Sequence, residues 1–159
     1  MFATRFICRR DIISIFELGA SEEERIFAVE IQKHPLGIVC LPSWAVPSVA
    51  LLGKHVAVWA GTNLYLFSEK DEPRRLQMDE EVDAVYEVGP SICIVGELSI
   101  RIFDGNLHEV DRYEADDVLG RSWWEGDCLL VELENATLKF SVSPNHLRKL
   151  NTLESDSFS

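Results

Sequence analysis

The chain has 159 residues, of which 47% are hydrophobic and 26% are charged. These proportions are typical of a globular domain and exclude a wholly disordered or collagen-like chain. Lysine and arginine total 15 against 27 aspartates and glutamates, so the net charge is −12. This charge repels polyanions, so we expect no nucleic-acid ligand.

No apolar run reaches the 18 or more residues that a membrane-spanning helix needs. The longest candidate, residues 38–52, is interrupted by Pro42 and Pro47. At the amino terminus, three arginines and an aspartate lie among the apolar residues, so the uninterrupted apolar segment of a secretory signal is missing. We therefore expect a cytoplasmic protein that does not bind a membrane.

The first 45 residues contain three strand candidates, RFICRRDIISIFEL, ERIFAVEIQ and GIVCLPSW, joined by the polar turns GASEEE and KHPLG. They are irregular in length. Three alternatives stay open: these strands form a degenerate copy of the repeat that follows them, they cap an open array of strands, or oligomerisation completes a ring.

Three similar segments follow, at residues 46–81, 82–117 and 118–152. Each begins with a short apolar strand that ends at a glycine suited to a tight turn, and a second strand follows. A third strand then ends at a phenylalanine, and a polar stretch closes the repeat. The turn glycines are Gly53, Gly89 and Gly126, and the phenylalanines, which are 36 and 37 residues apart, are Phe67, Phe103 and Phe140.

The closing stretch of each repeat is charged, as expected of an edge strand that discourages further pairing. Its charged residues are Arg74, Arg75, Glu109, Asp111, Arg112, Arg148 and Lys149. In the third strand of the second repeat, Leu98, Ile100 and Ile102 alternate with Ser99 and Arg101. This alternation predicts that the three apolar residues face the core and that the two polar ones face solvent.

Each repeat is therefore predicted to be a four-stranded antiparallel meander of about 36 residues. This arrangement resembles the blades of a β-propeller, whose sheets hold four strands in about 40 residues. No WD dipeptide or kelch double glycine occurs at a repeat boundary, so no specific family is assigned. The predicted fold is all-β, either β-propeller-like or a partly open β-sandwich, with a single domain over residues 1–152 and a flexible tail over 153–159.

No catalytic motif is present: the chain lacks GxSxG, a phosphate-binding glycine loop and HExxH. The carboxylates lack calcium-loop spacing. We therefore predict that the protein is not an enzyme and holds no cofactor or metal ion. The cysteines have no CxxC pair, and their apolar surroundings predict buried, reduced thiols. They are Cys8, Cys40, Cys93 and Cys128.

Acidic residues recur just before the next repeat begins, which predicts a rim of loops carrying negative charge. Trp59 fits a strand pattern and is expected in the core, as is at least one residue of the Trp123–Trp124 pair. Trp44 and the other member of that pair are candidates for binding. The predicted partner-binding residues are Asp79, Glu80, Glu81, Asp116, Asp117, Trp44, Trp123 and Trp124.

Two hypotheses about function follow. The first is a non-enzymatic protein-binding module whose acidic rim binds a basic protein, in its most specific form a bacterial immunity protein that neutralises a basic nuclease toxin. The second is a carbohydrate-binding or glycan-hydrolysing domain that uses tryptophan faces and rim carboxylates. The first is preferred because the acidic excess extends over the whole chain.

Overall fold

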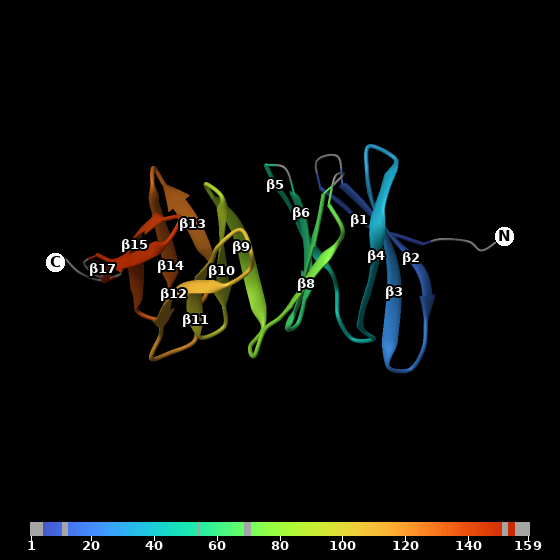
Figure 1. The fold of residues 1–159 in the computed structure, drawn as a ribbon. Coiled ribbons are helices and arrows are strands. Elements are labelled where there is room, and N and C mark those ends of the chain that lie inside the picture. Colours follow the sequence, from blue (N-terminus) through green and yellow to red (C-terminus); the bar gives the residue numbers. More distant parts are fainter. Residues whose placement is uncertain (1–4, 11–12, 54, 69–70, 151–152, 155–159) are drawn as a thin grey trace. The chain divides into compact units, whose positions relative to one another are not determined.

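The computed structural model describes residues 5–10, 13–53, 55–68, 71–150 and 153–154 (Figure 1). Over these residues the regular elements are all β-strands, arranged in four antiparallel sheets. No helix in this part of the chain is long and apolar enough to cross a membrane. The chain divides into two compact units, Met1–Glu81 and Val82–Ser159. The prediction that residues 1–152 fold as one domain stays a prediction.

The first unit contains two sheets whose strands pair in chain order. The strands of the first sheet are β1 (Arg5–Arg10), β2 (Ile13–Ala20), β3 (Glu24–Ile31) and β4 (His34–Pro42). Those of the second sheet are β5 (Ser48–Leu52), β6 (His55–Ala60), β7 (Asn63–Phe67) and β8 (Arg74–Gln77).

The second unit also contains two sheets. The strands of one are β9 (Val82–Val88), β10 (Ser91–Gly96), β11 (Ser99–Phe103) and β12 (Glu109–Glu114). Those of the other are β13 (Ser122–Glu125), β14 (Cys128–Glu132), β15 (Ala136–Ser143) and β16 (His146–Lys149). The short strand β17 (Leu153–Glu154) pairs with the start of β15, and residues 155–159 of the predicted tail lie outside the described part of the chain.

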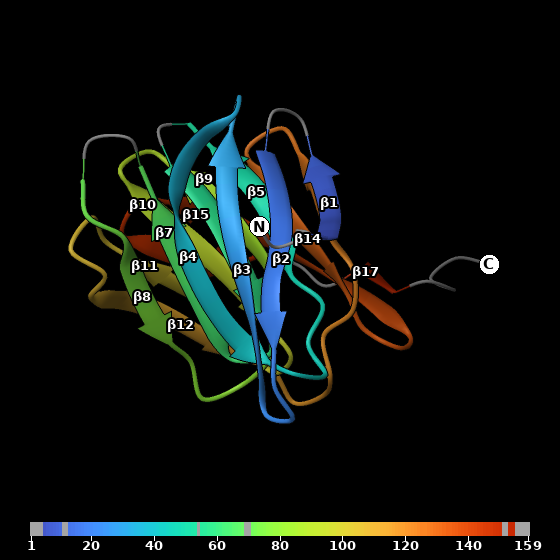
Figure 2. The ribbon, with the colours of Figure 1, turned by 90° about the vertical axis from the view of Figure 1, so that its right-hand side faces the viewer.

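The predicted four-stranded meander is confirmed in all three repeats, and the charged closing stretches are the outer strands β8, β12 and β16. The three turn glycines, Gly53, Gly89 and Gly126, all have positive φ, which glycine adopts without steric cost. Within the first 45 residues, strands β1 to β4 form a fourth sheet of the same order (Figure 2), because the first strand candidate, residues 5–18, contains two strands that pair with each other.

The core of the first unit lies between its two sheets. Ile15, Phe27 and Val39 from the first sheet pack in one cluster with Val58 and Phe67 from the second. These side chains are completely buried. Their removal from water is the main favourable term that holds the two sheets together.

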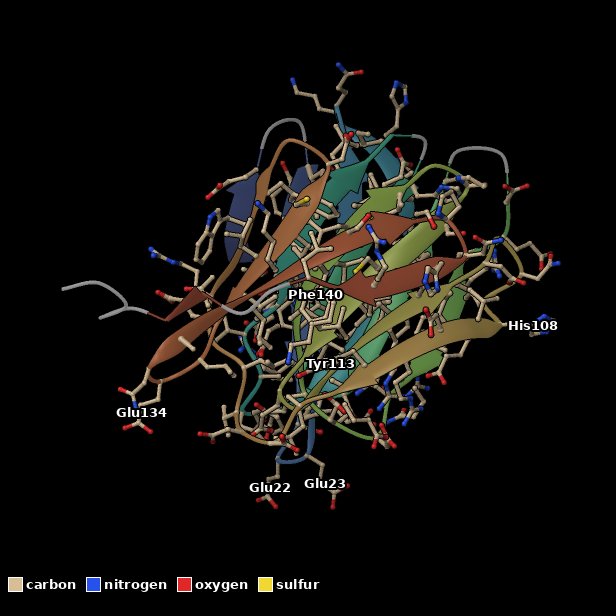
Figure 3. All side chains as sticks on the ribbon, turned by 90° about the vertical axis from the view of Figure 1, so that its left-hand side faces the viewer. Glu22, Glu23, His108, Tyr113, Glu134 and Phe140 are labelled. Atoms are coloured by element: carbon tan, nitrogen blue, oxygen red, sulfur yellow. The ribbon has the colours of Figure 1, made fainter. Side chains whose placement is uncertain are left out.

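The core of the second unit is built in the same way. Phe140 of β15 is completely buried and meets Tyr113 of β12 edge to face, with ring centroids 4.9 Å apart (Figure 3). Ile100 and Ile102 of β11 belong to the same cluster. An edge-to-face aromatic pair of this kind adds to the stabilisation that burial alone provides.

The three phenylalanines that mark the repeat occupy equivalent positions, since each pairs with the second residue of the preceding strand. Their pairing partners are Val56, Ile92 and Leu129. All three phenylalanines are buried, as predicted. Phe67 and Phe103 end their strands, but β15 continues to Ser143, so the prediction that Phe140 ends its strand is wrong.

The predicted alternation in β11 is wrong for its polar residues. Ser99 and Arg101 are buried, whereas Leu98 is 45% exposed in the turn before the strand. The Nε of Arg101 donates to Ser99 Oγ at 2.9 Å, and Arg101 Nη1 lies 3.6 Å from Glu109 Oε1. A buried guanidinium needs such partners, because an unpaired buried charge is very costly.

The prediction of buried cysteines is correct for Cys93 and wrong for Cys40. Cys93 is completely buried in the core of the second unit, and burial raises the pKa of its thiol to about 12. Cys40 is exposed because β4 directs it to the outer face of the first sheet. Cys128 has intermediate exposure, and the side chain of Cys8 lies outside the described residues.

Candidate functional site

Four connections of the first unit are linked by direct contacts and form what we call the rim of the first unit. They are residues 21–23, 43–47, 61–62 and 78–81. The amide of Ser43 donates to the carbonyl of Glu23 at 2.8 Å, and the amide of Met78 donates to the carbonyl of Thr62 at 2.8 Å. The ring of Trp44 lies against Gly61, which joins the two pairs.

Trp44 and Val46 are the apolar centre of this rim. Trp44 is 67% exposed and Val46 is 73% exposed. One edge of the indole packs on Gly61, where a Cβ would lie 3.0 Å from Cη2 of Trp44. Gly61 also has a φ of 57°, so the turn favours glycine for two reasons. The indole is held at its edge while its surface remains open to solvent.

The rim of the first unit is acidic. Glu22 and Glu23 stand in the turn between β2 and β3, and both are exposed (Figure 3). Asp79, Glu80 and Glu81 follow β8, with Asp79 and Glu81 exposed and Glu80 half-buried. The four connections contain no lysine or arginine. The result is a region of one sign of charge around two exposed apolar side chains.

Arg25, a cation beside this rim, is already paired. Arg25 Nη2 lies 2.7 Å from Glu17 Oε2, and Arg25 Nη1 donates to the carbonyl of Ala45 at 3.2 Å. Its guanidinium also stands 5.0 Å from the centre of the Phe27 ring. These contacts engage Arg25 with the sheet and with residue 45 of the rim, so it supports the connection that carries Trp44.

The second unit has a rim of its own, made by residues 97–98, 115–121 and 132–135. The amides of Ala115 and Leu119 donate to the carbonyls of Leu98 and Glu97 at 2.9 and 2.8 Å. The amide of Gly120 donates to the carbonyl of Glu132 at 2.8 Å. These backbone bonds fix the long connection after β12 against the neighbouring turns.

A cavity of about 310 Å³ opens in the rim of the second unit. It is lined by Asp117, Val118, Leu119, Gly120, Glu132, Leu133 and Glu134. Val118 is 52% exposed, and Glu134 extends from its turn away from the sheet (Figure 3). Asp116 and Asp117 are both exposed, and Asp117 Oδ1 accepts the amide of Val118 at 2.7 Å. Acidic groups again surround exposed apolar side chains.

The paired tryptophans of β13 point to opposite faces of their sheet, as the pleat requires. Trp124 packs on the core of the second unit and meets Tyr86 edge to face, with centroids 5.4 Å apart. The Trp123 Nε1 donates to Glu125 Oε2 at 3.3 Å, and the guanidinium carbon of Arg121 stands 5.5 Å from its ring centre. Both side chains are half-buried. Trp124 is the member of the pair that packs on the core, and Trp123 lies on the other face. Trp59 is buried, as predicted.

The structure brings Trp44 into one rim with Asp79, Glu80 and Glu81, and it places Asp116 and Asp117 beside Glu97, Glu132 and Glu134. The sequence interpretation did not select Glu22, Glu23, Val46, Val118 or Glu134. Glu22 and Glu23 carried a signal, since they form an acidic run in a polar turn. No feature of the sequence indicated that Val46 and Val118 are exposed, because their exposure depends on how the connections pack.

A second cavity, of about 410 Å³, lies at the start of β4 and the connection after β7 in the first unit, and it is lined by His34, Pro35, Leu36, Ser68 and Asp71. Asp71 accepts from the hydroxyl of Ser68 at 3.4 Å. Neither of the two cavities contains a tryptophan. Neither therefore combines the stacking surface and the carboxylates that the carbohydrate hypothesis requires.

No family model and no curated protein matches the sequence. The fold does match solved structures. The "AfRom2 CNH domain" has a TM-score of 0.57 at 9% identity, and the match covers 96% of this chain and 54% of that chain. The "Complex of KlAtg21 with coiled-coil of AgAtg16" has a TM-score of 0.58 at 13% identity, covering 95% and 57%. The N-terminal domain of Nup159 has a TM-score of 0.55 at 16% identity, covering 90% and 42%.

At these identities the likeness shows the fold alone. The chain spans about half the length of the solved structures it matches. These structures are β-propeller and WD40-like repeat proteins. Together with the four-stranded meanders described above, the likeness identifies the chain as an all-β protein built of β-propeller-like blade repeats.

Proposed function

We propose that the chain is a non-enzymatic protein-binding module whose acidic rims bind a basic protein segment. One observation carries the proposal: Trp44 and Val46 are exposed at 67% and 73% within connections that hold five carboxylates and no lysine or arginine. Large exposed apolar side chains surrounded by charge are characteristic of interaction surfaces.

The two kinds of side chain have different tasks in this proposal. The carboxylates attract a cationic partner and raise the rate of association, with a strong dependence on salt. Trp44 contributes affinity after encounter, because an indole that is already held against Gly61 loses little freedom when it is covered. Basic residues beside an apolar side chain are the partner chemistry that suits this surface.

The structural neighbours support a protein partner in a general way. The printed descriptions of two of them name complexes, KlAtg21 with the coiled coil of AgAtg16 and dbp5 bound to nup159. Neither description specifies a basic partner. The basic character of the ligand rests on the chain's own charge of −12 and on the composition of its rims.

The test is binding to a panel of basic proteins and of lysine-rich peptides with and without a leucine, measured by surface plasmon resonance at low and physiological ionic strength. The first variant neutralises Asp79, Glu80 and Glu81 to Asn and Gln. A matched control neutralises Asp71, Glu72 and Asp127, which are exposed in other connections, and so changes the net charge equally. The rim variant is expected to slow association more than the control.

Trp44→Ala and a variant neutralising Asp116 and Asp117 complete the set. Trp44→Ala should raise the dissociation rate and leave the salt dependence unchanged, since it removes no charge. If no basic protein binds at low ionic strength, or if the rim and control variants behave alike, the proposal is wrong. Trp123, on the outer side of β13, is then the next residue to examine.

A specific form of this function is an immunity protein that blocks a basic nuclease toxin. It is supported by the strong negative charge, which would favour rapid capture of such a toxin. Inhibition of basic nucleases in a DNA-cleavage assay tests it. Binding without inhibition would leave the protein-binding module standing and remove the immunity role.

A further inference from the structure

The cavity in the rim of the second unit has an apolar interior and a charged opening. Leu119, which is 3% exposed, and the half-buried Leu133 line its interior, and both leucines pack in the core of the second unit. Val118 lines the cavity on its exposed side. Asp117 and Glu134 are exposed carboxylates of the same lining, and Glu134 extends from its turn (Figure 3). The cavity therefore runs from the edge of the core to an acidic surface.

Hydrogen bonds hold this lining in place. The amide of Leu119 donates to the carbonyl of Glu97 at 2.8 Å, and the amide of Gly120 donates to the carbonyl of Glu132 at 2.8 Å. A Cβ on Gly120 would lie 3.4 Å from Cβ of Glu132, so the Glu132 side chain packs directly against this glycine. A cavity whose walls are fixed before binding loses little conformational freedom when it is filled.

We propose that this cavity takes one long cationic side chain, a lysine or an arginine, from the basic partner. The inference rests on the proposed function and names the group that the second rim recognises. A volume of about 310 Å³ lies at the lower end of the range for ligand cavities, which begins near about 300 Å³. It suits a single side chain better than a larger ligand.

A lysine or arginine side chain has the two properties that this lining requires. Its methylene stem is apolar and would lie against Val118 and Leu119, whereas its charged head would reach the carboxylates of Asp117 and Glu134. An apolar side chain would take water away from the carboxylates without replacing it, which costs free energy. An acidic side chain would be repelled. Polarity and charge together therefore select a long cation.

Arg121 is the one cation among the described residues of this rim, and its contacts show the chemistry of the site. Its Nη2 lies 3.5 Å from Oε1 of Glu132, and the two side chains are 76% and 42% exposed. An exposed pair at this distance contributes little stability. The guanidinium of Arg121 is therefore easily displaced from Glu132 when a cation of the partner enters. Arg121 thus competes weakly with the partner, and its removal should increase affinity.

Titration of the full chain with short peptides, followed by amide chemical shifts at low ionic strength, tests the proposal. The peptides have the sequence Lys-Gly-X-Gly-Lys, in which X is lysine, arginine or norleucine. We expect the amides of Val118, Gly120 and Glu134 to shift and to saturate. Norleucine keeps the methylene stem and lacks the charge, so the Kd of its peptide should be about tenfold higher than that of the lysine peptide.

Two variants with matched controls separate the stem from the charge. Val118→Ser removes apolar lining without changing the net charge and should raise the Kd of the lysine peptide about fivefold. Val110→Ser, at a 40% exposed valine of β12, is its control and should leave the Kd unchanged. Arg121→Gln should lower the Kd about threefold, whereas Arg148→Gln, at an exposed residue of β16, removes the same charge and should lower it less.

The position of the shifting amides distinguishes this proposal from the one on which it rests. Shifts confined to amides of the first rim, such as Gly61, would overturn the cavity and leave the basic-protein module standing. A norleucine peptide that binds as tightly as the lysine peptide, or a Val118→Ser variant that behaves like Val110→Ser, would also overturn the cavity. No shift in either rim with any peptide would count against both proposals.

Discussion

The ring of Phe67 occupies the space that a side chain at residue 37 would need. A Cβ built on Gly37 would lie 2.5 Å from Cε1 of Phe67, and Phe67 is completely buried in the core of the first unit. Gly37 stands in β4 and Phe67 ends β7, so this contact joins the two sheets of the unit. Glycine is needed here for close approach.

Gly37→Ala should therefore destabilise the protein by about 1 to 3 kcal/mol, the usual cost of overpacking a core. Phe67→Leu should lower the free energy of unfolding less in the Gly37→Ala variant than in the natural chain, because the smaller leucine side chain makes room for the methyl group added at residue 37. Denaturation with urea measures both effects. Gly19→Ala is the control, since a Cβ there meets nothing within 4 Å, and a loss as large as that of Gly37→Ala would contradict this account.

Truncating Phe67, Phe103 or Phe140 to Ala should cost about 3 to 5 kcal/mol each, because each phenylalanine is buried. Phe140 also loses its edge-to-face contact with Tyr113. The free energy of unfolding from urea titrations provides the measurement. Losses below about 1 kcal/mol at all three positions would show that the equivalent positions do not stabilise the sheets.

Asp111 should make a contribution to stability that depends on pH. Partial burial opposes its ionisation, but hydrogen bonds from the amides of Leu147 and Arg112 and the nearby imidazole of His146 outweigh that effect and lower the pKa of Asp111. The Leu147 amide donates to Asp111 Oδ2 at 2.6 Å and connects β12 to β16. A lowered pKa in the folded state means that the ionised form is stabilised by folding.

This contribution is present above the unfolded pKa, near 3.8, and is lost as the pH falls through the lower folded value. At neutral pH, Asp111→Ala should therefore destabilise the protein by about 1.5 to 3 kcal/mol, as expected for the loss of a hydrogen bond to a charged group. The difference between the two proteins should shrink below about pH 4. Denaturation at several pH values measures it, with Asp127→Ala, in an exposed turn, as the control. A difference that stays constant down to pH 2 would contradict the assignment.

Cys93 should be inert toward thiol reagents in the native protein, since it is completely buried and its pKa is about 12. The thiolate is the reactive form, and very little of it exists at pH 8. In a Cys40→Ser variant, mass spectrometry after alkylation should find Cys93 unmodified until the protein is unfolded. Modification of Cys93 at the rate of an exposed thiol would show that the core of the second unit opens easily.

The sequence by itself determined the strand class and the repeat. Short apolar strands that end at a turn glycine, such as Gly53, Gly89 or Gly126, specify β-hairpins locally. The alternation of side chains along a strand and the positive φ of the turn both depend only on residues that are neighbours in the sequence. Phe67, Phe103 and Phe140 revealed the period because the same ladder position recurs in each sheet. The acidic runs at residues 79–81 and 116–117 could also be recognised from the sequence, because they recur just before the next repeat begins.

Only the tertiary structure decided which faces are covered. Arg101 is buried and Cys40 is exposed, although the local pattern predicts the reverse for each. The contacts of Trp44 with Gly61 and of Asp111 with Leu147 join residues that are distant in the sequence. Whether a side chain is buried depends on which sheet packs over its strand. The sequence of the strand itself does not specify that neighbouring sheet.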